Sequence, residues 1–133
     1  MGTCNLSETC LGYATKGGDL LADLDIIADL FKSEVYQLLD YFKGQGIITE
    51  NMIDRVPSAG LHENQRDQDD LGYTYDEMEP SMRYIIGFDE VDRESDIFKF
   101  VAKKYEESEH KRKVAPPLID LRDLCDDKDI FLS

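Results

Sequence analysis

Two charged side chains near the start of the sequence, Glu8 and Lys32, are of the types that act on phosphate groups. Glu8 is the third residue of a short helix expected from Asn5 to about Tyr13. A carboxylate there could hold Mg²⁺ beside backbone N–H groups that favour phosphate. In the alternative, Asn5 and Glu8 form only a capping box that satisfies the first N–H groups of the helix. These residues alone leave both interpretations open.

Two lysines have a similar ambiguity. Lys32 lies at the edge of an apolar helical stripe, a position that lysines usually avoid, although its ammonium could still reach water along its own methylene stem. Lys16 lies beside two glycines in the loop over residues 15–23, where it could reach an anion or simply be solvated. Neither lysine identifies a ligand by itself.

A basic segment near residue 110 departs from an otherwise acidic sequence. Five of the 15 Lys and Arg residues lie between Lys103 and Lys113, and His110 is among them. Cations at the end of a helix complement its dipole, which is the ordinary explanation. The stretch from Pro57 to Gly60, which contains Ser58, is an ordinary turn when considered alone.

Net charge and hydropathy exclude two classes of partner. The 15 basic and 29 acidic residues give a net charge of −14, which repels nucleic acid and anionic lipid. No apolar run approaches the ~20 residues that span a bilayer, and the N-terminus has no secretory signal pattern. We therefore expect no nucleic-acid or membrane partner and a cytoplasmic location. The 133 residues suit one domain.

The three cysteines do not suggest a disulfide framework. Cys4, Cys10 and Cys125 are odd in number and lack Cys-x-x-Cys spacing. We expect reduced, buried thiols, with a zinc site as the alternative.

Most of the sequence has helical periodicity. A long helix is expected from about Ile26 to Lys43, with a broad apolar stripe. A helical turn over 49–55 and a long polar loop over 57–72 follow. Thr74 and Glu77 form a second capping box, and Pro80 should kink or restart the helix that it opens.

A last amphipathic helix is expected from about Glu94, with prolines at 116 and 117 closing it off. An acidic tail follows over residues 118–133. The only expected strand is the stub at residues 1–4.

Six motifs occur in an order and spacing that resembles the C-terminal half of ammonia-dependent NAD synthetase. They are GTCNLSE, LGYATKGGD, ADLDIIADLFKSEV, VPSAGL, DQDDLGYTYDE and EHKRKVAPP, and they cover residues 2–117. The resemblance implies an α/β fold, represented here by the C-terminal, mostly helical portion of a Rossmann-like adenine-nucleotide alpha-hydrolase fold without its N-terminal parallel-sheet half. Residues 1–117 would be part of the synthetase domain and residues 118–133 an acidic tail.

The resemblance also implies a reaction. Enzymes of this family join deamido-NAD and ammonia with ATP and Mg²⁺, through an adenylated intermediate, to give NAD. The reaction requires no nucleophile from the enzyme. What the enzyme must supply is neutralisation of the negative charge around the phosphates.

Roles carry over from the family position by position. Glu8 would bind Mg²⁺; Thr3, Lys32 and Ser58 would contact ATP, with Lys32 and Ser58 stabilising its phosphates. Ser58 stands where many relatives have Thr. The positions that match contacts to deamido-NAD are Lys16, Asp23, His110 and Lys111. A homodimer is implied as well, because the family binds its dinucleotide at a dimer interface.

One motif of the family is missing from these 133 residues: the Ser-Gly-Gly-x-Asp-Ser phosphate loop. The loop would cradle pyrophosphate and supply a second Mg²⁺ carboxylate. We therefore expect a truncated synthetase or one half of a split enzyme, which pairs with an N-terminal half. The alternatives are a non-catalytic dimerisation or interaction protein derived from the synthetase, and an acidic helical binding module related only by ancestry.

The missing loop leads to a first prediction. The purified chain, mixed with ATP, deamido-NAD, ammonia and Mg²⁺, should release AMP no faster than a protein-free control. Rapid AMP release by the chain alone would show that the loop is dispensable.

Overall fold

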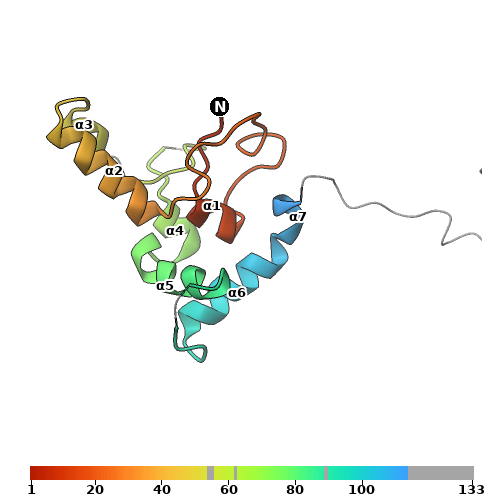
Figure 1. Cartoon of the computed structure of the whole chain (residues 1–133). Coiled ribbons are helices and arrows are strands. Elements are labelled where there is room, and N and C mark those ends of the chain that lie inside the picture. The colour runs from red at the N-terminus through yellow and green to blue at the C-terminus, as the bar shows by residue number, and fades with distance from the viewer. Residues whose placement is uncertain (54–55, 62, 89, 114–133) are drawn as a thin grey trace, which may run out of the picture.

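The computed structural model describes residues 1–53, 56–61, 63–88 and 90–113 (Figure 1). These ranges contain seven α-helices and no strand, apart from one isolated parallel bridge between Gly2 and Asp25. The helices are α1 (Leu6–Leu11), α2 (Lys32–Gly44), α3 (Glu50–Ile53), α4 (Asp67–Leu71), α5 (Tyr75–Ile85), α6 (Asp96–Glu107) and α7 (Glu109–Arg112). The expectation of a mostly helical chain is confirmed, and the expected strand at residues 1–4 is reduced to the bridge.

Helix α1 starts with the expected capping box. The Asn5 side chain accepts a hydrogen bond from the Glu8 backbone N–H at 3.0 Å, and the Glu8 carboxylate accepts one from the Asn5 N–H at 3.1 Å. The helix ends at Gly12, whose φ of 63° lies in the left-handed region. A side chain at Gly12 would also collide with Ser108, whose Cβ would be 2.1 Å from the added carbon. Gly12 thus lets the end of α1 approach the end of α6.

Helices α5 and α6 pack against each other and against α1 to form the core. Met78, Met82 and Val101 are fully buried there. Helix α5 continues through Pro80 rather than restarting, because the proline removes only one N–H and the flanking methionines fix the helix in the core. The capping box of Thr74 and Glu77 is confirmed.

Helix α2 begins six residues later than the periodicity predicts. Phe31 is buried with an extended backbone, so the chain turns at Phe31 and becomes helical only from Lys32. None of the α2 residues is fully buried. Leu38, Tyr41 and Phe42 are between 38% and 60% exposed, and α2 and α3 project away from the core (Figure 1). The apolar stripe of α2 is therefore only partly covered.

The polar segment after Pro57 is more ordered than the sequence suggests, because it contains α4. Asp67 and Leu71 anchor this short helix by their burial. Of the helices that the structure describes, none has the length and apolarity needed to cross a membrane.

Cys4 and Cys10 are free, buried thiols, as expected. Burial raises the pKa of each to about 11. Cys125 lies outside the described residues.

These raised pKa values predict slow alkylation. At pH 7.5 the thiolate fraction of Cys4 and Cys10 should be roughly a hundredfold below that of an ordinary thiol, since each pKa is raised by about two. Iodoacetamide labelling, followed by peptide mass spectrometry, should show slow reaction that accelerates up to about pH 11. The urea-unfolded chain is the control, and equal rates in both states would contradict the burial of these thiols.

Candidate functional site

A cavity of about 580 Å³ opens between α1, the glycine-rich loop after it and the segment that leads into α4. It brings together four of the predicted site residues, which come from three separate parts of the sequence. They are Thr3, Glu8, Ser58 and Lys111. Three residues that the sequence analysis did not single out, Tyr13, Asp67 and Asp70, also line it.

Glu8 and Lys32 form an ion pair, with 2.8 Å between Glu8 Oε1 and Lys32 Nζ. Both side chains are less than one-fifth exposed. The Lys32 ammonium also lies 5.1 Å from the centre of the Tyr75 ring. It therefore points to a carboxylate and an aromatic face inside the molecule, rather than along its stem to water.

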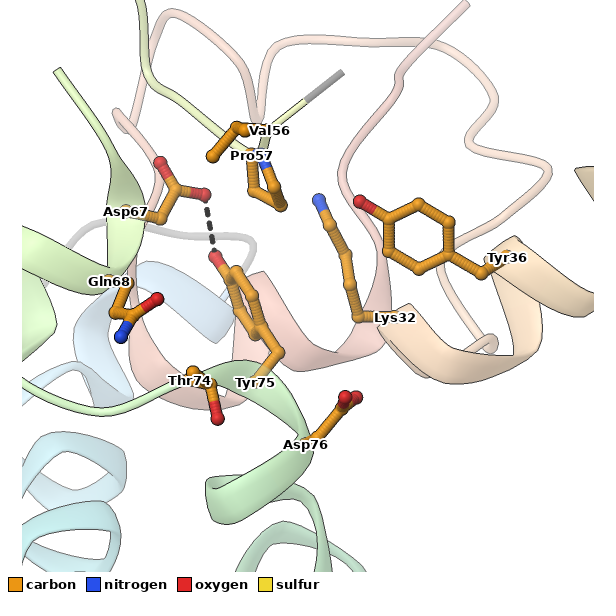
Figure 2. Close-up of a pocket in the computed structure, with 9 residues that line it drawn as sticks. All are labelled: Lys32, Tyr36, Val56, Pro57, Asp67, Gln68, Thr74, Tyr75 and Asp76. Carbon is orange, nitrogen blue, oxygen red and sulfur yellow. Dashed lines mark hydrogen bonds between the residues drawn. The ribbon is translucent and has the colours of Figure 1, made fainter. Parts of the chain in front are cut away.

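Lys32 belongs to a second, smaller pocket of about 200 Å³ (Figure 2). Tyr36, Pro57 and Tyr75 give this pocket flat apolar surfaces, and Lys32 and Asp67 contribute charge. Asp67 lines both the pocket and the larger cavity. The two spaces thus share a wall at Asp67, and Glu8 and Lys32 connect them from α1 and α2.

Asp67 is a buried carboxylate, only 3% exposed. One of its oxygens accepts a hydrogen bond from the Tyr75 hydroxyl at 3.0 Å, and the other has no partner among the described residues. Burial raises the pKa of Asp67, although the Tyr75 hydrogen bond opposes this shift. Asp67 stands in a run of polar residues, where no sequence pattern distinguishes it as the buried one.

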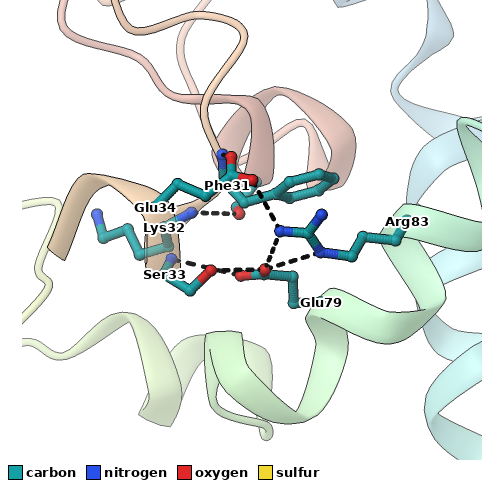
Figure 3. Close-up of polar contacts among 7 residues, drawn as sticks. Phe31, Lys32, Ser33, Glu34, Glu79 and Arg83 are labelled. Atoms are coloured by element: carbon teal, nitrogen blue, oxygen red, sulfur yellow. Dashed lines mark hydrogen bonds and ion pairs between the residues drawn. The ribbon is translucent and has the colours of Figure 1, made fainter. Parts of the chain in front are cut away.

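The start of α2, which carries Lys32, is fixed to two other helices (Figure 3). The Lys32 backbone N–H donates to Ser7 Oγ of α1 at 2.9 Å. The next residue, Ser33, donates its hydroxyl and its backbone N–H to Glu79 of α5, at 2.6 and 3.3 Å. Helices α1 and α5 therefore determine the position of the Lys32 backbone.

Two predicted residues, Lys16 and Lys111, make reciprocal contacts between the glycine-rich loop and α7. Lys111 Nζ donates to the carbonyl oxygens of Gly12 and Ala14 at 2.7 and 2.9 Å. Lys16 Nζ donates to the carbonyl oxygens of His110 and Lys113 at 2.8 and 3.3 Å. The structure thus brings Lys16 to the backbone beside Lys111 and brings Lys111 to the backbone beside Lys16.

Two other predicted residues, Asp23 and Ser58, take no part in these lysine contacts. Asp23 is exposed in the loop before α2 and lines neither of the two cavities. Ser58 lines the larger cavity, and its hydroxyl accepts the Gly60 N–H at 3.0 Å. Nothing in these contacts assigns a ligand to either side chain.

The donor set around Glu8 suits one role for a magnesium ion. No group of three metal-ligating side chains occurs in the part of the chain that the structure describes. Mg²⁺ is commonly held by one or two carboxylates together with substrate phosphates and water. Glu8 fits the part of a single carboxylate ligand, whereas a complete protein cage is not present in the described ranges.

Comparisons with known proteins identify the same family. The sequence model described as NAD synthase matches residues 1–115. The chain is 39% identical over 123 residues to the NH(3)-dependent NAD(+) synthetase of Mycoplasmopsis pulmonis, and 37% identical over 123 residues to that of Archaeoglobus fulgidus. These matches cover 92% of this chain but only 44% and 47% of the two relatives. The chain therefore spans about half the length of the curated relatives that it matches.

A solved structure gives the same result for the fold. The structure of NMN synthetase from Francisella tularensis superposes with a TM-score of 0.70 and 33% sequence identity. It covers 90% of this chain and 46% of that chain. The described helices thus correspond to about half of a known synthetase fold.

The Tyr75–Asp67 hydrogen bond leads to a prediction about stability. Tyr75→Phe leaves the buried, ionised Asp67 without its donor at pH 7, which should cost about 1–3 kcal/mol of unfolding free energy. The pKa of Asp67 is raised, so the cost is present above that pKa and is lost as pH falls through it. Thermal unfolding followed by circular dichroism at pH 7 and pH 3.5 measures the difference.

Tyr41→Phe is the matched control, because Tyr41 is 60% exposed on α2. It should change stability little at either pH. An equal loss for Tyr75→Phe at both pH values would mean that the ionised form of Asp67 does not depend on Tyr75.

Proposed function

The chain belongs to the NAD synthase family, of the NH3-dependent type, and on this basis we propose that it supplies the C-terminal part of a site that amidates deamido-NAD to NAD. The Glu8–Lys32 ion pair carries the proposal. It lies where two cavities meet, and Glu8 lines the larger one together with Thr3 and Ser58. A triphosphate requires a cation such as Lys32, and its metal ion requires a carboxylate such as Glu8.

In the proposed reaction, the nicotinate carboxylate attacks the α-phosphate of ATP, and pyrophosphate leaves. Ammonia then attacks the acyl carbon of the adenylate, and AMP leaves as the amide forms. Lys32 would approach the triphosphate and offset its growing negative charge. Glu8, released from Lys32, would hold Mg²⁺, which neutralises phosphate charge when bound. Thr3 and Ser58 would contact ATP through their hydroxyl groups.

The reciprocal lysines support a role in holding deamido-NAD. An ammonium group has three N–H donors, and those of Lys16 and Lys111 each contact two backbone carbonyl oxygens. Both side chains are thus held in place while a donor remains for an anionic ligand. We assign His110 and Asp23 to the same ligand by their positions in the family motif.

A complete site needs residues beyond these 133. The phosphate loop Ser-Gly-Gly-x-Asp-Ser is absent from the sequence, and the chain spans about half of its relatives. We propose that activity requires an N-terminal half that carries this loop, with a homodimer as the assembled form. The partly uncovered α2 stripe supports an association of this kind.

The same exposed stripe favours a second candidate function. A chain that pairs with a synthetase through α2 without turning over substrate would also expose Leu38, Tyr41 and Phe42. Catalysis in the assembled form distinguishes the two candidates.

The complementation experiment uses the full chain together with the N-terminal portion of the Mycoplasmopsis pulmonis synthetase that precedes the matched region. AMP release should appear with ATP, ammonia, Mg²⁺ and deamido-NAD only when both polypeptides are present. The mononucleotide that corresponds to deamido-NAD should be assayed in parallel as an alternative substrate, because one solved relative is described as an NMN synthetase.

Two variants test the assigned charges in that complex. Lys32→Gln and Glu8→Gln should each lower the rate by about 10²–10³-fold, since each removes a charge that acts on phosphate in the transition state. Lys103→Gln is the control, because its side chain is 72% exposed on α6. Association without AMP release would favour the interaction protein. Full activity of both site variants would refute the assigned roles.

A further inference from the structure

The residue at the N-cap of helix α2 has no side chain that can cap the helix. The residue at its N-cap is Phe31, which has no side-chain acceptor, although the first N–H groups of any helix lack partners within the helix. The Phe31 N–H donates to the Glu34 carboxylate at 2.8 Å. The N–H groups of the next two residues find acceptors on other helices.

Those two acceptors come from residues far away in the sequence. Ser7, which is fully buried in α1, accepts the Lys32 N–H at 2.9 Å. Glu79 in α5 accepts the Ser33 N–H at 3.3 Å and the Ser33 hydroxyl at 2.6 Å. Apart from the Glu34 contact to the Phe31 N–H, the start of α2 is thus capped by two other helices.

Glu79 is the more heavily used of these acceptors. Its side chain is only 9% exposed, so its charge needs compensation. Arg83, one turn later in α5, supplies it by donating to Glu79 Oε1 from Nε at 3.0 Å and from Nη2 at 2.9 Å. Arg83 Nη2 also reaches Glu34 Oε1 at 2.9 Å, and the guanidinium lies 4.3 Å from the centre of the Phe31 ring (Figure 3). The carboxylate of Glu79 is held rigidly as a result.

We propose that Glu79 is a positioning residue for Lys32. By holding Ser33, it fixes the first turn of α2, so that the Lys32 ammonium lies against Glu8 rather than in solvent. The role of Lys32 in binding phosphate rests on the proposed function. The positioning of Lys32 by Glu79 is independent of that function. A displacement of about 1 Å at a reacting group can cost about 10²-fold in rate, which is why such an anchor matters.

The test measures the acetylation rate of individual lysines in the full chain, with no substrate present. An acetylating reagent is added at pH 8, and each lysine is followed by peptide mass spectrometry. In Glu79→Ala, the rate at Lys32 should rise by roughly fivefold relative to Lys111, the factor expected from the loss of one helix cap. Lys111 is the internal reference, because it is half-buried and would react faster if the whole chain loosened.

Two further variants separate positioning from general destabilisation. Ser33→Ala removes the hydroxyl donor but leaves the Glu79–Arg83 pair intact, so Lys32 should react faster even if Glu79→Ala folds poorly. The double variant should add little to Glu79→Ala, since both changes remove the same contact. Ser95→Ala is the matched control, because it removes the N-cap of α6, and it should leave Lys32 unchanged.

Three results would overturn the proposal. The first is an unchanged rate at Lys32 in both Glu79→Ala and Ser33→Ala. The second is an equal rise at Lys32 and Lys111, and the third is a Lys32 in the unaltered chain that reacts as fast as the exposed Lys103. Because no substrate is used, a failure of the complementation assay leaves these outcomes untouched, and the two proposals fail separately.

Discussion

The ion pair between Glu8 and Lys32 depends on how the first turn of α2 is held. Glu8 is fixed at the start of α1 by its capping box, so its position follows from local sequence. Lys32 has less local support, because its helix begins at a buried phenylalanine and Glu34 supplies only one of its capping contacts. Acceptors from α1 and α5 pair with the first N–H groups of α2. The Lys32 ammonium then lies 2.8 Å from the Glu8 carboxylate. The site is therefore assembled by packing between helices rather than by a single motif.

Sequence reasoning captured the features that depend on local chemistry. The capping boxes at Asn5 and Thr74, the overall helical character and the burial of Cys4 and Cys10 follow from short-range patterns. The family, and the fact that the chain covers only part of it, followed from motif order.

Features that depend on distant contacts were not predicted. The apolar periodicity predicts that α2 starts at about Ile26, because it extends through residues that the structure shows as turns. The sequence around Asp67 predicts a polar loop, yet Asp67 is buried, and no pattern within α5 distinguishes Glu79 as a buried acid. Burial of an acidic residue depends on which donors the fold brings to it, here Tyr75 and Arg83, and a single sequence does not show that.

The central claim is that Lys32 is held against Glu8 before any ligand arrives. NMR of the lysine ammonium groups in the ¹⁵N- and ¹³C-labelled chain tests this most directly. The account predicts a resolved, slowly exchanging Lys32 ammonium signal at neutral pH, with a hydrogen-bond coupling to the Glu8 side-chain carboxyl carbon. A Lys32 signal that exchanges with water as fast as those of the exposed lysines, without that coupling, would contradict it.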